Sequence, residues 1–302
     1  MDKLSKIILI SGPTASGKSS FAIKLARKIN GEIINADSMQ VYKQLKILTA
    51  RPSKINQKNV IHHLYGFQNV RKIFSTGTWL KLTIKKIQKI RKKNKIPIIV
   101  GGTGLYFKAL TDGLVKIPNI PTKVRNQTRI LQKKLGQEKF YQKLIKLDPL
   151  IKNQINFNDP QRSARAFEIK KFTKISITKW FQNTKILFEE EAFVKIYIDF
   201  SRQSLTERIK ERVDKMFNDG VISEVKKFNK LKVKNENSVN KVIGIQEIGK
   251  YLKGELSLSE TKEKICIKTR QYAKRQETWA RGHMMSWQKI NPNDLTLVLK
   301  KI

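Results

Sequence analysis

The chain has 302 residues, of which 39% are hydrophobic, which excludes wholesale disorder and suits one large domain or a domain with an insertion. Its 63 Lys and Arg residues against 24 Asp and Glu residues leave a formal net charge of +39, as in proteins that bind nucleic acid. The lone Cys266 excludes an intramolecular disulfide and a cysteine-based zinc site, and no apolar run could cross a bilayer, so we expect a cytoplasmic protein without a membrane partner.

The basic excess has a second explanation. Lysine supplies 49 of the 63 basic residues and the chain is rich in Ile and Asn, a pattern that drift in genome composition also produces. Arginine is more informative, because its planar fork makes bidentate phosphate contacts that lysine cannot copy. The arginine clusters are therefore candidate phosphate-binding sites, and surface ion pairing is the alternative for each. The clusters are Arg162 with Arg165, Arg208 with Arg212, and Arg270 with Arg275 and Arg281.

The first predicted elements are a strand at 6–11 and an amphipathic helix at 18–29, joined by a glycine-rich turn. The turn matches the phosphate-binding loop (P-loop) pattern, in which glycines let backbone N–H groups converge on a phosphate chain. A lysine adds a positive charge there, and the following serine can bind magnesium. The predicted diphosphate-binding residues are Gly12, Pro13, Thr14, Ala15, Ser16, Gly17, Lys18 and Ser19, with Ser19 as the metal ligand. The loop alone leaves open which phosphate compound it holds.

Two further strand segments follow. The segment 31–38 reads as a strand that delivers Asp37 at its carboxyl end, and 95–110 reads as a buried strand, a glycine turn and a helix that opens near Thr103. The turn after Val100 contains no acid, whereas a nucleotide hydrolase or kinase would need a carboxylate there for magnesium. Strands alternating with helices predict an α/β fold with a parallel sheet flanked by helices, whose ligands gather at the carboxyl ends of the strands.

The pattern changes between about residues 113 and 190, where a linker with two prolines precedes helical segments. A strand at 192–200 then returns to the sheet, with Asp199 read as a helix N-terminal acid, and the remaining segments are helical. We therefore predict a P-loop α/β core at 1–112 and 192–302, and an inserted helical domain at 113–191. The three helices expected after the strand span 204–217, 222–228 and about 259–281.

Five blocks in order resemble the tRNA dimethylallyltransferases over residues 7 to about 287. They are the loop Gly12–Ser19, Asp37-Ser38 with Tyr42-Lys43, Val100 to Tyr106, Asp159 to Arg162 with Arg165, and Thr269 to Gln276 with Trp279. The resemblance implies that the loop holds the diphosphate of dimethylallyl diphosphate. It also implies transfer of the prenyl group to the exocyclic N6 amine of the adenosine 3′-adjacent to the anticodon, in tRNAs that read codons starting with U.

The resemblance implies that the inserted helical domain at 113–191 binds tRNA, and it assigns roles to individual residues. Asp37 would accept the proton that the amine loses, Thr103 would orient the substrate, and Lys18 with Ser19 would hold diphosphate and Mg²⁺. Arg208 or Arg212 would reach the diphosphate from the far side. The residues that correspond to tRNA-contacting positions are Asp37, Ser38, Met39, Gln40, Thr103, Arg125, Gln161, Arg162, Ser163, Ala164, Arg165, Lys241, Val242, Ile243, Gly244, Ile245, Gln246, Arg270, Lys274 and Arg275.

The expected partners are the tRNA anticodon stem-loop and dimethylallyl diphosphate, and we expect the chain to act as a monomer. At 241–246 the chain departs from the family, where members often have an arginine, a Gly-Tyr pair and another basic residue. The main alternative is a P-loop small-molecule kinase or NTPase. A non-enzymatic RNA-binding protein with a vestigial loop, and prenylation of free AMP or ADP, are two others; the last would not need so much cationic surface.

Overall fold

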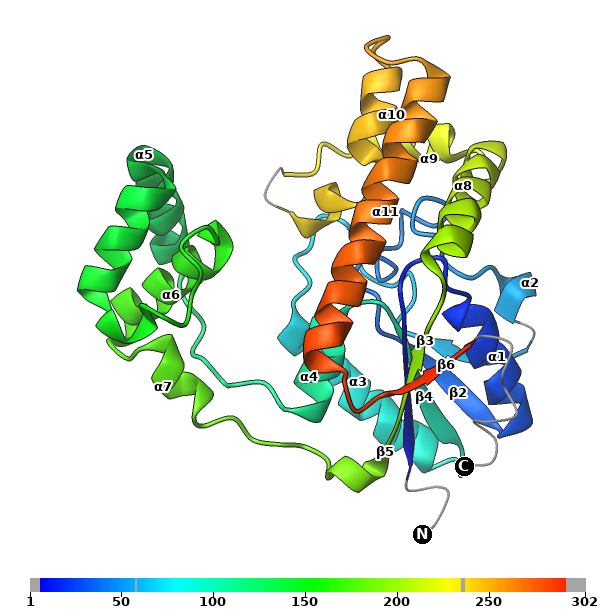
Figure 1. The fold of residues 1–302 in the computed structure, drawn as a ribbon, viewed down its shortest axis with the longest axis horizontal. Helices are drawn as coiled ribbons and strands as arrows, with labels where there is room; N and C mark the ends of the chain where they lie inside the picture. Colours follow the sequence, from blue (N-terminus) through cyan, green and yellow to red (C-terminus); the bar gives the residue numbers. More distant parts are fainter. Residues whose placement is uncertain (1–5, 58, 235–236, 292–302) are drawn as a thin grey trace. The chain divides into compact units, whose positions relative to one another are not determined.

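The computed structural model describes residues 6–57, 59–234 and 237–291 (Figure 1), and the outermost parts of the predicted core, 1–5 and 292–302, lie outside these ranges. The chain forms two compact units, one of residues 1–110 and 188–302 and one of residues 111–187. The junctions predicted from the sequence were 112/113 and 191/192.

The first unit is built on a six-stranded sheet in the order β3-β2-β4-β1-β5-β6, and every pairing in it is parallel. The strands β1 and β4 are buried along their whole length because helices cover both faces of the sheet. This confirms the predicted α/β fold. The strands are β1 (Ile7–Ser11), β2 (Gly31–Asn35), β3 (His62–His63), β4 (Ile96–Gly101), β5 (Phe193–Ile198) and β6 (Gln288–Ile290).

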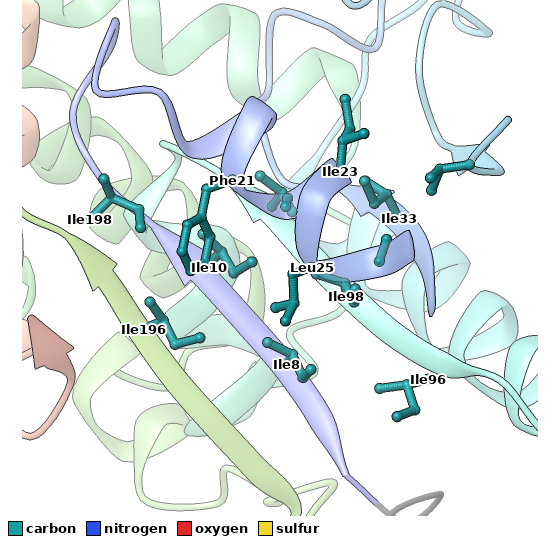
Figure 2. Close-up of a cluster of buried hydrophobic side chains, with 14 of the residues drawn as sticks. Ile8, Ile10, Phe21, Ile23, Leu25, Ile33, Ile96, Ile98, Ile196 and Ile198 are labelled. Atoms are coloured by element: carbon teal, nitrogen blue, oxygen red, sulfur yellow. The ribbon is translucent and has the colours of Figure 1, made fainter. Parts of the chain in front are cut away.

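Helix α1 packs on one face of this sheet. Its buried residues Phe21 and Leu25 point toward Ile8 and Ile10 of β1 (Figure 2), because apolar residues at helical spacing meet those that a strand presents on alternate positions. Helix α3 packs on β2 and β4, where Trp79 is fully buried and its indole N–H donates a hydrogen bond to the carbonyl of Asn35 at 2.7 Å.

The remaining helices of this unit lie beyond the carboxyl ends of the strands or beside the sheet. A second apolar cluster forms among α8, α9, α10 and α11, together with the segment after β2. No helix of the described residues is both long and apolar enough to cross a membrane. The helices are α1 (Lys18–Lys28), α2 (Lys54–Gln57), α3 (Thr76–Arg91), α4 (Gly104–Thr111), α8 (Arg202–Asn218), α9 (Val221–Asn229), α10 (Ile245–Tyr251) and α11 (Leu258–His283).

The second unit contains helices with a small core of their own. Its helices are α5 (Thr122–Leu147), which is kinked at Gly136, α6 (Pro160–Thr173) and α7 (Ile177–Phe181). Phe140 and Phe167, from α5 and α6, lie with their ring centroids 5.2 Å apart, and eight other buried apolar residues belong to the same cluster. The unit therefore has the hydrophobic contacts of a separately packed body.

The turn after β4 lies close against the end of β2. A Cβ atom at Gly101 would stand 2.1 Å from the carbonyl carbon and oxygen of Ala36, so only glycine fits there. The amide of Thr103 donates to the same carbonyl at 3.1 Å. This contact brings the turn after β4 against the turn that carries Asp37.

Candidate active site

The loop between β1 and α1 has the backbone geometry of a phosphate site. Gly17, directly before α1, is left-handed with a φ of 87°, a conformation that glycine adopts without penalty. Ala15 also has a positive φ, 68°, which costs a residue with a Cβ about 1–2 kcal/mol. The amides of the first turn of α1 have no carbonyl partner within the helix, so they are available to an anion. Strain of this kind concentrates at functional sites.

Positive side chains surround the cavity that opens above this loop. The cavity measures about 360 Å³ and is lined by Lys18 and Ser19 of α1, by Asp37, and by Arg208 and Arg212 of α8. The Lys18 ammonium group donates to the carbonyl of Pro13 at 2.9 Å, which holds it over the loop. Burial lowers the pKa of Lys18 to about 8, while Asp37 opposes and Arg212 adds to the shift. Burial also lowers the pKa of Arg212. A bound polyanion would offset this clustering of cations.

Asp37 stands beside this group on a turn that its own carboxylate organises. Its Oδ1 accepts from the amides of Met39 at 2.8 Å and Gln40 at 3.3 Å, the pattern of an Asx turn. Asn35, the fully buried last residue of β2, accepts from the Asp37 amide and donates to the Asp37 carbonyl, both at 2.9 Å. Among the described residues no donor bonds to Oδ2, so this oxygen is available to a substrate.

Thr103 touches the same turn from the other side. Its hydroxyl oxygen accepts from the amide of Ser38 at 3.0 Å and lies 3.3 Å from the Ser38 hydroxyl. Thr103 is partly buried and immediately precedes α4. Its hydroxyl is therefore hydrogen-bonded to the residue that directly follows Asp37. Of the three residues assigned to catalysis from the sequence, Asp37 and Thr103 lie on the turns after β2 and β4, and Lys18 is the first residue of α1, after β1; these three strands are neighbours in the sheet.

A second, more apolar cavity of about 300 Å³ adjoins the first. The two cavities share Thr14, Asp37 and Arg212 as lining residues. Most of the other side chains around the second cavity are hydrophobic: Met39, Leu48, Val213, Met216, Val242, Ile243, Ile265 and Tyr272. An anion in the first cavity and an apolar group in the second would therefore meet beside Asp37.

The chemistry of the first cavity fits Mg²⁺ only if a substrate supplies part of its coordination. Magnesium prefers hard oxygen ligands and commonly binds through one or two protein oxygens together with phosphate oxygens and waters. Ser19 and Asp37 offer such oxygens at this cavity. Among the described residues, however, no three His, Cys, Asp or Glu side chains are grouped so that they could hold a metal alone.

Besides Asp37 and Thr103, the residues assigned to RNA in the first unit lie in three regions. Ser38, Met39 and Gln40 follow Asp37 on its turn, and Lys241 to Gln246 span the segment before and into α10. Arg270, Lys274 and Arg275 are exposed on α11, and the Arg275 guanidinium lies 5.7 Å from the centroid of the Tyr272 ring. Within the 241–246 segment Lys241 and Gln246 are exposed, whereas Val242, Gly244 and Ile245 are buried.

The residues assigned to RNA in the second unit are Arg125 of α5 and the segment Gln161–Arg165 of α6. Gln161 and Arg162 are exposed, and Arg162 pairs with Asp159 at 3.3 Å. Arg165 lies 3.4 Å from Glu168, an ion pair of the kind expected of a surface arginine. Ser163 is fully buried and its hydroxyl donates to the carbonyl of Asp159, so its neighbours, and not Ser163, are exposed to a partner.

Several lining residues were not singled out from the sequence. Tyr65, Glu211 and Lys215 line the first cavity, and burial together with Asp37 raises the pKa of Tyr65. Asn35 and Gln276 act on the site through backbone groups of its loops. The two residues of α8 follow Arg208 and Arg212 at helical spacing and were within reach of a sequence argument. Asn35 stands two residues before Asp37, so its bonds to that turn are local. Gln276 ends one of the blocks that carry the family resemblance, but its bonds to Thr14 and Gly102 are long-range and have no local signal.

Comparison with known proteins is consistent with this geometry. The family model described as IPP transferase matches residues 40–283. The chain belongs to the IPP transferase family. It is 62% identical over 302 residues to a tRNA dimethylallyltransferase of Pelagibacter ubique (strain HTCC1062), a match that covers 100% of this chain and 96% of that protein. It is 43% identical over 286 residues to a tRNA dimethylallyltransferase of Rhizobium etli, covering 94% of this chain and 96% of the relative.

Solved structures of this family have the same fold. A full-length tRNA isopentenylpyrophosphate transferase from Bacillus halodurans superposes with a TM-score of 0.70 at 29% identity, covering 98% of this chain and 94% of that one. A eukaryotic dimethylallyltransferase described as acting on tRNA superposes with a TM-score of 0.82 at 29% identity, covering 96% of this chain and 75% of the other. These findings confirm the predicted family, the α/β fold and the assignment as an enzyme of the prenyltransferase class.

Proposed function

We propose that this member of the IPP transferase family transfers the dimethylallyl group of dimethylallyl diphosphate to N6 of the adenosine 3′-adjacent to the anticodon. The tRNAs concerned are those that read codons starting with U. The observation that carries the proposal is the meeting of a cationic cavity and an apolar cavity beside Asp37. The first suits a diphosphate and the second a five-carbon chain, so the allylic C–O bond between them would lie at the carboxylate.

The loop and its cations bind the leaving group in this proposal. When the allylic C–O bond breaks, its electron pair goes to the diphosphate oxygen, whose negative charge grows. The amides around Gly17, with Lys18 and Arg212, are aimed at that charge from fixed positions, and one such donor typically contributes a factor of 10² to 10³ in rate. Magnesium held by Ser19 would neutralise part of the same charge.

Asp37 is assigned the role of proton acceptor. The N6 lone pair forms the new C–N bond at the allylic carbon, and the amine must lose one proton to become neutral. Oδ1 of Asp37 accepts hydrogen bonds from the backbone amides of Met39 and Gln40, and Oδ2 would receive that proton. Thr103, bonded to Ser38 beside this carboxylate, would orient the adenine.

The tRNA is assigned to the exposed cations of α11, to the half-buried Arg125 of α5 and to the exposed residues Gln161 and Arg162 of α6. An unpaired loop base leaves its stack at a lower cost than a paired base, which suits an adenosine beside the anticodon. Binding of phosphates by arginine and lysine side chains fixes the RNA without reading its sequence. We expect the protein to act as a monomer in the cytoplasm, where its tRNA substrate is found.

The direct test supplies purified protein with dimethylallyl diphosphate, Mg²⁺ and unmodified tRNA. Mass spectrometry of the digested tRNA should show one dimethylallyl group in place of a hydrogen on the adenosine beside the anticodon. A parallel reaction with ATP and no prenyl donor tests the kinase alternative and should show no magnesium-dependent ATP consumption. Absence of prenylation on every tRNA tested would refute the proposal.

A further inference from the structure

One side chain of α11 joins the two loops that border the reacting centre. The Gln276 Oε1 accepts from the amide of Thr14 in the phosphate loop at 2.8 Å. Its Nε2 donates to the carbonyl of Gly102, in the turn after β4, at 2.9 Å. Gln276 is partly buried and lies 262 and 174 positions along the chain from these two residues. An amide is suited to this arrangement because it carries a donor and an acceptor on one rigid plane.

Each backbone group that Gln276 binds is next to a side chain of the site. Thr14 lines both cavities, and its amide, engaged by Gln276, is not free to turn toward a phosphate. Gly102 precedes Thr103, whose hydroxyl accepts from Ser38 beside Asp37. The position of the Gln276 side-chain amide therefore affects both the place where the two cavities meet and the turn that holds the Asp37 carboxylate.

The packing at Gly102 indicates that this contact is close as well as hydrogen-bonded. A Cβ atom at Gly102 would stand 2.1 Å from the Gln276 Nε2, so the glutamine occupies the space that any larger residue would need. Gly104, two residues on, similarly leaves no room for a Cβ atom, because the Trp279 indole lies 2.0 Å from the position it would take. The turn after β4 is therefore shaped to receive α11 along its length.

We propose that Gln276 is a positioning residue for the prenyl transfer: it holds the Thr14 and Gly102 loops at the separation that places the diphosphate and Asp37 for reaction. The inference rests on the proposed function. Arg270, Lys274 and Arg275 of the same helix are exposed, and their charges do not depend on these two bonds. Gln276 contacts neither the diphosphate nor the base in this proposal, and it acts through the loops.

The test uses Gln276→Glu in the full-length protein. A protonated glutamic acid reproduces the donor and acceptor of glutamine, whereas the ionised form offers only acceptors and faces the Gly102 carbonyl with a negative charge. We expect kcat at pH 8.5 to fall about 100-fold relative to the wild type, as a displacement of about 1 Å would cause. The ratio of variant to wild-type kcat should then recover about tenfold or more toward pH 5.5, as the added carboxyl is protonated.

Two further variants separate positioning from general damage. Gln276→Met keeps the volume but removes both bonds, so its kcat should be low at every pH, and its ratio to the wild type should not recover in acid. Thr278→Ala, an exposed position on the same helix, should behave as the wild type. Affinity for tRNA, measured by filter binding at both pH values, should change less than threefold in all three variants, because the exposed cations of α11 are untouched.

Inorganic diphosphate binding gives a readout that does not depend on transfer. If the wild type prenylates no tRNA, the proposed function fails, while a pH-dependent loss of diphosphate affinity confined to Gln276→Glu would still support the positioning role. A Gln276→Glu protein whose kcat and diphosphate affinity both follow the wild type across the pH range would overturn it. A loss of affinity for tRNA alone, with kcat and diphosphate affinity unchanged, would also overturn the positioning role.

Discussion

At the scale of single residues, Asp37 is the group on which the proposed chemistry depends. In Asp37→Asn the side-chain oxygen still accepts from the amides of Met39 and Gln40, so the turn should persist, but no strong base remains. We expect the single-turnover rate to fall about 10²- to 10⁴-fold. Binding of tRNA, measured in the same preparation, should stay within a few-fold of the wild type. A variant with unchanged turnover would refute the role of Asp37 as proton acceptor.

Lys18 should make diphosphate binding depend on pH in the alkaline range. Its pKa is lowered to about 8 by burial, so it is charged below that pH and progressively neutral above it. A neutral amine does not attract an anion, and the dissociation constant of a non-reactive dimethylallyl thiodiphosphate should rise between about pH 8 and 9.5, by up to tenfold per pH unit.

The matched control for this effect is Lys18→Gln, which cannot gain or lose the proton. Calorimetric titration of both proteins at each pH cancels the ionisation of the ligand, because that is common to the pair. The expected result is that the wild type binds more tightly at pH 7 and that the difference shrinks as the pH rises. A difference that stays constant up to pH 9.5 would contradict the lowered pKa.

At the scale of secondary-structure elements, the approach of β4 to the end of β2 creates the site. Gly101→Ala would place a Cβ atom 2.1 Å from the Ala36 backbone, which cannot move aside without separating the two strands. We expect a loss of about 3 kcal/mol or more in the free energy of unfolding, the upper end for overpacked sites. Urea unfolding followed by circular dichroism measures it.

A glycine in open space serves as the control for this substitution. Gly282 lies in α11, and a Cβ atom there would meet nothing within 4 Å. Gly282→Ala should leave the free energy of unfolding unchanged or raise it by up to about 1 kcal/mol, because alanine loses less backbone entropy in a helix. Equal destabilisation by the two alanines would mean that the close approach at Gly101 is not what matters.

At the scale of the whole molecule, the net charge of +39 is expected to act mainly through the cations that face RNA. Each Lys or Arg that replaces a phosphate counterion steepens the dependence of affinity on salt. Arg270→Gln, on the exposed face of α11, should reduce the slope of log affinity against log salt by about 0.7 to 0.9. Filter binding of an anticodon stem-loop between 50 mM and 300 mM salt gives the slope.

The control residue is Lys28, which is exposed at the last turn of α1. It is not among the residues that we propose to contact RNA. Lys28→Gln should leave the slope unchanged if the lysine excess is largely compositional. Equal reductions in both variants would mean that RNA responds to the overall charge and not to the arginine-bearing helix.

The sequence alone determined the elements with strong local signals. The strands β1, β2, β4 and β5 contain short runs rich in Ile and Val, and α1, α8 and α11 have regular apolar spacing, so each could be predicted without knowledge of its neighbours. The segment Gly12–Ser19 could be predicted as a phosphate-binding loop because glycines at fixed spacing permit the backbone conformation that such a loop needs, and that assignment stays a prediction. The identity of the family followed from five motifs in order, and the comparisons confirm it.

The elements that were not predicted have different causes. The strands β3 and β6 contain two and three residues, too few for any periodicity, and they exist because the edges of the sheet pair with them. Helix α3 was within reach, since Ser75 caps its first turn and buried residues recur at helical spacing, but it was not singled out. Asp199, which was interpreted from the sequence as a helix N-terminal acid, stands two residues before Ser201, the N-cap of α8. Its backbone N–H donates a hydrogen bond to the carbonyl of Ile290.

What only the tertiary structure decided is which residues meet. The local pattern could assign Asp37, Thr103 and Lys18 to the ends of three strands, because carboxyl ends of parallel strands share one edge of a sheet. It could not show that Gln276 bonds to both neighbouring loops, since these contacts join segments far apart in the chain. Local propensity acts over a few residues, whereas a side chain finds such partners only after the sheet and its helices have packed.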